Sequence, residues 1–185
     1  MSAFLRAFGA PTWRWPYEPD HRDRVVALHD VPQSDIGAPL PMMVAGEGVL
    51  HIAFALAGRH PPSGEMPRFV TVDSDDRDVA VVTFQHPCAH LFGPPNDEAF
   101  EGHPLASRGL EPYGAFEVEN SSWIRALERM NAVHEHHRPE RILSLRHFVL
   151  SFHDSCFECA ARGFRVAVAW GSIRAIALSA AAGPD

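Results

Sequence analysis

The sequence predicts an α+β domain in which a mainly antiparallel β-sheet carries one main helix packed on one face. Strand-like apolar runs outnumber helical ones, short polar turns separate them, and a single segment combines helical apolar spacing with a capping signal. Strands joined by tight turns pair antiparallel, and the apolar face of such a sheet needs a covering layer. These observations indicate the α+β class.

The expected strands begin with residues 50–56, where Leu, Ile, Phe and Leu occupy every second position. This period of two places the large side chains on one face. Further strands are expected at residues 68–73, 79–86, 115–119, 147–153 and 164–170. Polar turns are expected to join four of them into two hairpins, one through residues 74–77 and one through Arg162-Gly163.

The main helix is expected at residues 121–135. Residues 120–122 offer N-cap oxygens for the free amide groups of the first turn. Side chains at spacings of four, three and four then form a stripe, namely Trp123, Leu127, Met130 and His134. We expect the beginning of this stripe to pack on the sheet. Pro139 ends the helix and starts a short second one that extends to Leu145.

The chain of 185 residues is long enough for one domain with its own core. Residues 1–20, rich in Trp and Pro, are expected to form an irregular arm, and residues 21–180 to form the domain. Aromatic side chains on such an arm usually pack against their own domain, because their exposure to water is unfavourable. A partner-binding arm is the alternative.

Composition excludes several classes of function. The formal net charge is −7 and no basic stripe is present, so nucleic acid is not an expected partner. Every one of the 16 residues counted as Lys or Arg is Arg, so the chain cannot form a Schiff base with pyridoxal phosphate, and it has no P-loop nucleotide site. The apolar stretch at residues 1–10 is too short for an expected signal peptide, and no run approaches about 18 apolar residues. We expect a cytoplasmic protein without membrane contact.

Three cysteines, Cys88, Cys156 and Cys159, are odd in number and do not suggest a disulfide scaffold. Cys156 and Cys159 form a lone C-x-x-C pair in a strand-like run, where no helix dipole stabilises a thiolate. We expect reduced, buried and mostly inert thiols. A zinc site or a redox pair is the alternative.

The connection at residues 87–112 is unusual. It exceeds the roughly 15 residues of most structureless connections, and such segments are either functional or disordered. Its phenylalanine and leucine side chains favour an ordered loop. Polar groups on an ordered long loop are natural binding groups. The candidate binding residues on this loop are Asn96, Asp97 and Glu101.

Histidine is abundant, with 12 residues in the chain. In an extended segment residues i, i+2 and i+4 share a face, so His86, Cys88 and His90 are candidate ligands for a divalent metal such as zinc or iron. Pro87 within this pattern argues against regular strand geometry. The histidines at residues 134–137 fall at the expected end of the main helix and indicate a solvated cluster.

The candidate catalytic residues, as acid–base groups or metal ligands, are His90, His103, His153 and Asp154. His153 and Asp154 are adjacent on an expected strand, so they point to opposite faces. Each then needs a partner from the long loop, such as Asp97, Glu101 or His103. We expect the loop to fold so that His90 or His103 lies beside His153.

Three strings stand out: residues 34–39 (SDIGAP), the loop at residues 92–105, and residues 152–159 (FHDSCFEC). Together they resemble a family of uncharacterised bacterial proteins of similar length, to which no activity is attached. The resemblance covers roughly residues 25–170 and implies one domain. It implies no catalytic residue.

Two classes of function fit these observations. The first is a small cytoplasmic enzyme with a histidine and carboxylate pocket under the loop at residues 87–112. The second is a non-catalytic accessory protein that binds a partner or a small ligand through the same loop. Convergence of the polar groups on a concave pocket would favour the enzyme, and their spread over the surface would favour the accessory protein.

Overall fold

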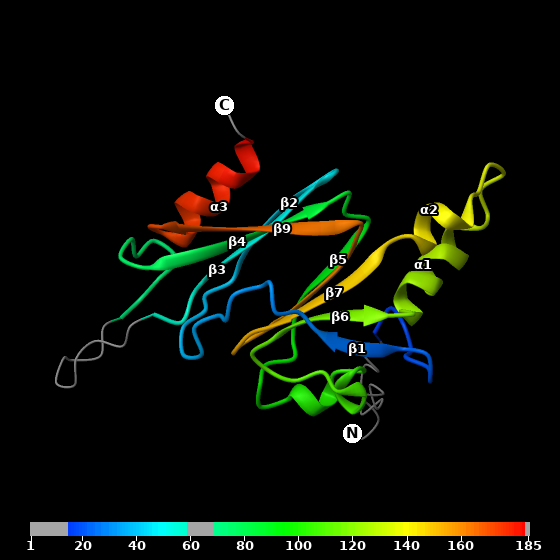
Figure 1. The fold of residues 1–185 in the computed structure, drawn as a ribbon, viewed down its shortest axis with the longest axis horizontal. Coiled ribbons are helices and arrows are strands. Elements are labelled where there is room, and N and C mark those ends of the chain that lie inside the picture. The colour runs from blue at the N-terminus through cyan, green and yellow to red at the C-terminus, as the bar shows by residue number, and fades with distance from the viewer. Residues whose placement is uncertain (1–14, 59–68, 184–185) are drawn as a thin grey trace, which may run out of the picture.

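Two antiparallel sheets form the framework of the computed structural model, which describes residues 15–58 and 69–183 (Figure 1). The strands are β1 Arg24–Ala27, β2 Met42–Gly46, β3 Val49–Ala55, β4 Asp78–Gln85, β5 Ala89–Gly93, β6 Ala115–Glu119, β7 Arg146–Ser151, β8 Cys156–Ala161 and β9 Gly163–Trp170. The helices are α1 Ser122–Asn131, α2 Pro139–Leu143 and α3 Ile173–Ala182, with the short 3₁₀ helices η1 Phe100–Gly102 and η2 Ala106–Arg108. One sheet has the order β1-β6-β7-β8-β5 and the other the order β2-β3-β4-β9.

A bent two-stranded ribbon connects the two sheets. β4 pairs with β9 in the four-stranded sheet, and β5 pairs with β8 in the five-stranded sheet. At the bend the Arg162 amide donates to the Gln85 carbonyl and the Cys88 amide donates to the Ala160 carbonyl, each at 2.8 Å. Paired strands that pass from one sheet to the next form a corner. The two sheets therefore share one interior.

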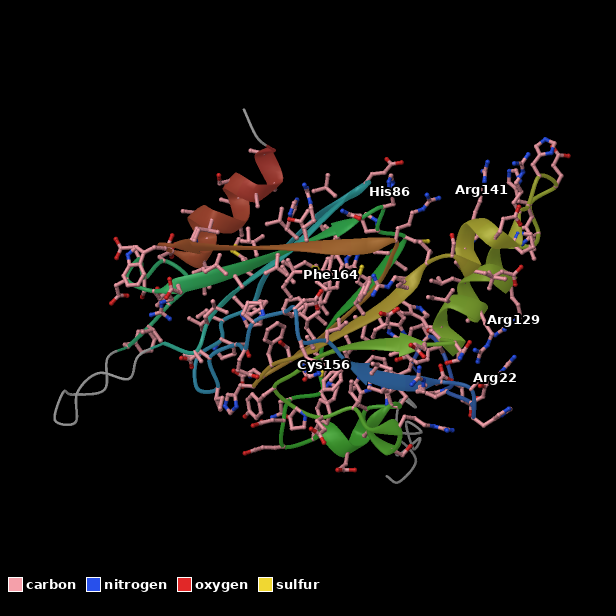
Figure 2. All side chains as sticks on the ribbon, in the orientation of Figure 1. Arg22, His86, Arg129, Arg141, Cys156 and Phe164 are labelled. Carbon is pink, nitrogen blue, oxygen red and sulfur yellow. The ribbon has the colours of Figure 1, made fainter. Side chains whose placement is uncertain are left out.

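Aromatic side chains fill much of the space between the sheets. Phe54, Phe84, Phe148 and Phe157 are buried there. The ring of Phe84 lies 5.9 Å from that of Phe148 and 5.3 Å from that of Phe157. Phe164, at the start of β9, packs partly buried against the same cluster (Figure 2). Burial of this apolar surface is the main stabilising contribution to such a core.

Each sheet is also covered on its outer face. α3 covers the four-stranded sheet, where Ile173 and Ala177 pack with Val79 and Val81. α1 and the segment between β5 and β6 cover the five-stranded sheet (Figure 1). Tyr17 of the predicted arm is buried in this second outer core, and Trp15 packs against it. These two aromatic residues pack against their own domain as expected, whereas residues 1–14 of the arm lie outside the described residues.

The predicted α+β class is confirmed, as are several elements. β6 coincides with the strand expected at residues 115–119, and α1 begins after the N-cap Ser121, whose Oγ accepts a hydrogen bond from the Ile124 amide. Trp123 is 3% exposed, as predicted, but Met130 of the same stripe is 65% exposed. Only the first turn of α1 is buried. Leu127 is partly buried against the same core, so the helix packs by its residues up to Leu127 and not along its whole length.

Three predicted features are corrected. Residues 69–73 form no strand. β7 pairs with β8 rather than with β9, because the bend at Arg162 carries β9 into the other sheet. α3 is a second helix of the same length as α1 that the sequence pattern did not predict. Its single charged residue, Arg174, leaves an almost wholly apolar segment without the polar face that marks an amphipathic helix.

Candidate functional site

The long predicted loop is ordered and begins with a strand. Residues 89–93 form β5 rather than irregular chain, and the remainder carries η1 and η2. Phe100, Leu105 and Leu110 are buried in the outer core of the five-stranded sheet. These apolar anchors hold the segment in place, as predicted. They position its polar side chains against β8 and against the turn between β7 and β8.

A buried carboxylate cluster lies beneath this segment. Glu158, in β8, is 1% exposed and faces the outer core. Tyr17 Oη donates a hydrogen bond to Glu158 Oε2 at 2.6 Å, and His147 Nε2 of β7 lies 2.8 Å from the same oxygen. His103 Nε2 lies 3.5 Å from the other oxygen, Oε1. We call these four residues the Glu158 cluster.

The hydrogen bonds on the far side of each imidazole define where its proton lies. Ser121 Oγ accepts from the Ile124 amide, so its hydroxyl can donate to His147 Nδ1, 2.9 Å away. The Leu105 amide donates to His103 Nδ1 at 3.2 Å. Because His103 Nδ1 is an acceptor, the His103 imidazole carries its proton on Nε2, and His147 Nε2 donates to the Glu158 carboxylate, which can only accept. Each Nε2–H group then points towards the carboxylate.

The Glu158 carboxyl has a lowered pKa. Burial raises the pKa of the Glu158 carboxyl, but the interactions with His103 and His147 together outweigh it and lower this pKa to about 2. Burial and the neighbouring carboxylate raise the pKa of Tyr17, which therefore stays a hydroxyl donor. Burial and Glu158 also raise the pKa of the Cys156 thiol to about 12. At neutral pH the carboxylate is ionised and Cys156 is an uncharged thiol.

Two buried polar atoms of the cluster lack a hydrogen-bond partner among the described residues, Glu158 Oε1 and His103 Nε2. A cavity of about 410 Å³ adjoins the cluster. Apart from Glu158 its lining is mainly apolar, and its walls include Trp15, Leu91, Phe92, Pro95 and Cys156. We call it the Glu158 cavity. It combines an apolar wall with a buried charge.

A second carboxylate–imidazole cluster lies at the turn between β7 and β8. His153 Nδ1 is 3.0 Å from Asp97 Oδ2, and Tyr113 Oη donates to that same oxygen and lies 2.9 Å from His153 Nδ1. The Asp97 amide donates to the His153 carbonyl at 2.9 Å. We call these three residues the Asp97 cluster. It is partly open to water, since the His153 side chain is 40% exposed and that of Asp97 is 19% exposed.

The charges of the Asp97 cluster orient its imidazole. The hydrogen bond from Tyr113 holds the pKa of Asp97 below its usual value, and the same bond raises the pKa of Tyr113 to about 12. An ionised Asp97 favours the His153 tautomer with its proton on Nδ1 and leaves Nε2 as an acceptor. His153 Nε2 lies 3.9 Å from Oδ1 of Asp154, whose side chain is 86% exposed.

His153 has a partner from the loop, but it is not one of the histidines expected there. Asp97, named among its candidate partners, is the loop residue in contact with it. His103 belongs to the Glu158 cluster instead, and its ring stacks on Phe100 at 5.9 Å. His90 is exposed on β5. The anchors of the loop turn His103 inward, which the spacing of the sequence did not reveal.

The predicted metal ligands do not converge. Among residues 15–58 and 69–183, no three His, Cys, Asp or Glu side chains form a group that could hold a metal ion. His86 lies at the bend between β4 and β5 with a φ of +49°, so His86, Cys88 and His90 do not follow one regular strand. Figure 2 shows His86 well away from Cys156. Cys156 and Cys159 are buried, as expected, but they pack in different cores on opposite faces of β8.

The remaining predicted site residues shape a turn or lie exposed at the surface. Asn96 Oδ1 accepts a hydrogen bond from the Ala99 amide at 3.0 Å and so shapes the turn before η1. Glu101 is exposed on η1, and Asp154 is exposed beside His153. Asn96 and Glu101 line neither cluster. Of the three predicted binding residues, only Asp97 takes part in one.

Three members of the Glu158 cluster were not predicted: Tyr17, His147 and Glu158. One signal for them exists in the sequence. Glu158 is the only charged residue in the run Cys-Phe-Glu-Cys-Ala-Ala of β8. A charge in a buried strand requires partners, because an unpaired charge in the interior is strongly unfavourable. That signal identifies the carboxylate, whereas its partners come from distant parts of the chain.

Comparisons of the chain with protein-family models, with curated proteins and with solved structures find no match. In the described parts of the chain, no helix has the length and apolar character that a membrane-spanning helix needs. The chemistry of the two clusters is therefore the main evidence on the function of this protein.

Proposed function

We propose that this protein binds a small molecule in the Glu158 cavity, with the Glu158 cluster as the polar wall of the site. The observation that carries the proposal is the pair of buried, unpartnered atoms, Glu158 Oε1 and His103 Nε2, beside a mainly apolar cavity of about 410 Å³. Ligand sites typically combine apolar walls with a few fixed polar groups, at volumes of about 300–1,000 Å³.

The energetics of these atoms support the proposal. A buried polar group without a partner destabilises a protein by roughly 1–3 kcal/mol, and a charged group by more. A ligand with a matching polar group removes part of this penalty. The imidazoles of His103 and His147 are held on their far sides by the Leu105 amide and by Ser121. Groups fixed in this way lose little freedom on binding, which favours affinity.

Thermal unfolding in the presence of a library of small molecules tests the proposal. A ligand at about tenfold excess over its dissociation constant should stabilise the protein by about 1.4 kcal/mol, or roughly 3–5 °C. Phe92→Ala removes part of one cavity wall and should weaken this response. Phe69→Ala is the matched control, because Phe69 is 89% exposed and does not line the cavity.

A second variant fills the cavity, whereas Phe92→Ala enlarges it. Ala99→Trp places a large side chain at the lining of the cavity and should abolish the stabilisation. The proposal fails if no compound stabilises the wild-type protein, or if stabilisation persists unchanged in both Phe92→Ala and Ala99→Trp.

General acid–base catalysis by His153 is a second candidate function. The observation that favours it is the 3.0 Å distance between Asp97 Oδ2 and His153 Nδ1, since a carboxylate on Nδ1 orients an imidazole for proton transfer through Nε2. It ranks second because the adjoining cavity of about 220 Å³ is lined by Tyr113 but not by Asp97 or His153.

Hydrolysis of an activated ester such as p-nitrophenyl acetate tests the second candidate. If His153 is a general base, His153→Gln should lower the rate by about 100-fold or more. His136→Gln is the control, because the His136 side chain is 81% exposed and lies far along the chain from the cluster. Equal rates in the two variants would remove His153 from this role.

A further inference from the structure

Within the part of the chain that the structure describes, no arginine side chain contacts the Glu158 carboxylate. Among the described residues, the groups that contact the carboxylate are the Tyr17 hydroxyl and the imidazoles of His103 and His147. His103 accepts a hydrogen bond from the Leu105 amide at Nδ1 and so faces the carboxylate with Nε2–H. A buried carboxylate is more stable when it also faces a permanent positive charge.

The two carboxylate oxygens differ in what they can still accept. Oε2 already accepts from Tyr17 at 2.6 Å and lies 2.8 Å from the Nε2–H of His147. Oε1 accepts no hydrogen bond within the described chain, and Glu158 is part of the cavity lining. The open position therefore favours a donor, and the charge favours a cationic one.

From this arrangement we infer that the ligand of the Glu158 cavity is an organic amine, whose ammonium group donates to Glu158 Oε1 while a small apolar or aromatic body fills the cavity. This inference rests on the proposed function, because it names the class of molecule for that same site. A neutral alcohol supplies the donor without the charge, and a carboxylic acid brings a second negative charge.

The cavity walls match the same class of ligand. Trp15 and Phe92 both line the cavity, and aromatic faces attract ammonium groups. The ring of Trp15 also lies 4.8 Å from that of His103. Trp15 therefore brings an aromatic face close to the Glu158 cluster.

A metal ion fits this position less well than an ammonium group. The Leu105 amide donates to His103 Nδ1 at 3.2 Å, which leaves the proton of His103 on Nε2. A protonated nitrogen cannot bind a metal ion. Among the described residues, the side chains of the Glu158 cluster included, no three His, Cys, Asp or Glu residues form a group that could hold a metal ion.

Three probes with the same aromatic body test the inference: 2-phenylethylamine, 2-phenylethanol and 3-phenylpropionate. Isothermal titration calorimetry at neutral pH should show the amine binding roughly 10- to 100-fold tighter than the alcohol, the effect of a hydrogen bond between charged groups. The carboxylate probe should bind weakest. Glu158→Gln should remove the preference for the amine, and Glu101→Gln, a matched change at an exposed carboxylate on η1, should keep it.

The outcomes separate the inference from the proposed function. If amine and alcohol bind with equal affinity and both bind more weakly to Phe92→Ala, the cavity is a ligand site but the inference of an amine is wrong. If none of the three probes binds and the library gives no stabilisation, the proposed function fails as well. Should Glu158→Gln not fold, the order of affinities in the wild-type protein decides, since it needs no variant.

Discussion

Two clusters in this molecule contain the same chemical groups, a tyrosine, a carboxylate and histidine, in opposite surroundings. All members of the Glu158 cluster are buried. The Asp97 cluster lies at the surface, with His153 40% exposed. Water can replace a lost hydrogen bond at the surface but not in the interior, so the same contacts are expected to contribute very differently to stability. Surroundings, rather than composition, therefore distinguish the two clusters.

The largest expected effect is that of removing the buried carboxylate. Glu158→Ala leaves two buried donors, the Tyr17 hydroxyl and His147 Nε2, without their acceptor and should lower the free energy of unfolding by about 3–5 kcal/mol, as measured by urea denaturation. Asp97→Ala should lower it much less, because water reaches that site. Similar losses of the free energy of unfolding in the two variants would mean that burial does not distinguish the two clusters.

The next largest effect is expected at low pH, where the Glu158 carboxyl becomes protonated. The pKa of Glu158 is lowered from 4.5 to about 2 in the folded protein, so its contribution is present above about pH 4.5 and is lost as the pH falls towards 2. The loss should be on the order of 3 kcal/mol. Urea denaturation between these pH values should show a steeper decline for the wild-type protein than for Glu158→Gln. Parallel curves would mean that this carboxyl titrates normally.

The two tyrosines provide a matched pair of smaller changes. Tyr17→Phe removes one buried donor from a carboxylate and should lower the free energy of unfolding by roughly 1.5–3 kcal/mol. Tyr113→Phe removes the corresponding donor from Asp97 at the surface and should have the smaller effect. A larger loss for Tyr113→Phe, from the same urea titrations, would reverse the expected order.

The smallest expected effect concerns the reactivity of the cysteine thiols. One of them, that of Cys156, lies in the wall of the Glu158 cavity. Cys88 is exposed, whereas Cys156 and Cys159 are buried and burial raises the pKa of each of their thiols. A thiol reagent should therefore label one cysteine per native chain and three per denatured chain. Rapid labelling of Cys156 in the native protein would mean that the Glu158 cavity opens readily.

Local features of the fold were predictable from the sequence. The alternation at residues 50–56, the strand at residues 115–119 and the N-cap before α1 depend on neighbours in the chain, and all three are found. α3 was not predictable from amphipathic spacing, because its segment is almost wholly apolar. The pairing of β9 was also missed: the turn signal at Arg162-Gly163 predicted a hairpin, whereas the chain bends there and β9 joins the other sheet.

The candidate site was predictable only in part. An ordered loop with apolar anchors was expected, and so was a loop partner for His153, which is Asp97. The Glu158 cluster was not expected as a unit. Its hydrogen bond between Tyr17 and Glu158 joins residues 141 positions apart, and no spacing rule connects positions so distant.

The α+β class and the apolar anchoring of the long segment were predictable from the sequence alone, as was the absence of a lysine that could form a Schiff base. These properties depend on composition or on short-range periodicity, which each segment carries alone. His103 faces a buried carboxylate, and Cys156 and Cys159 face opposite cores. These contacts are visible in the tertiary structure and not in the sequence. Such contacts arise when burial of apolar side chains brings distant segments together, and the polar groups that accompany them must then find partners in the interior.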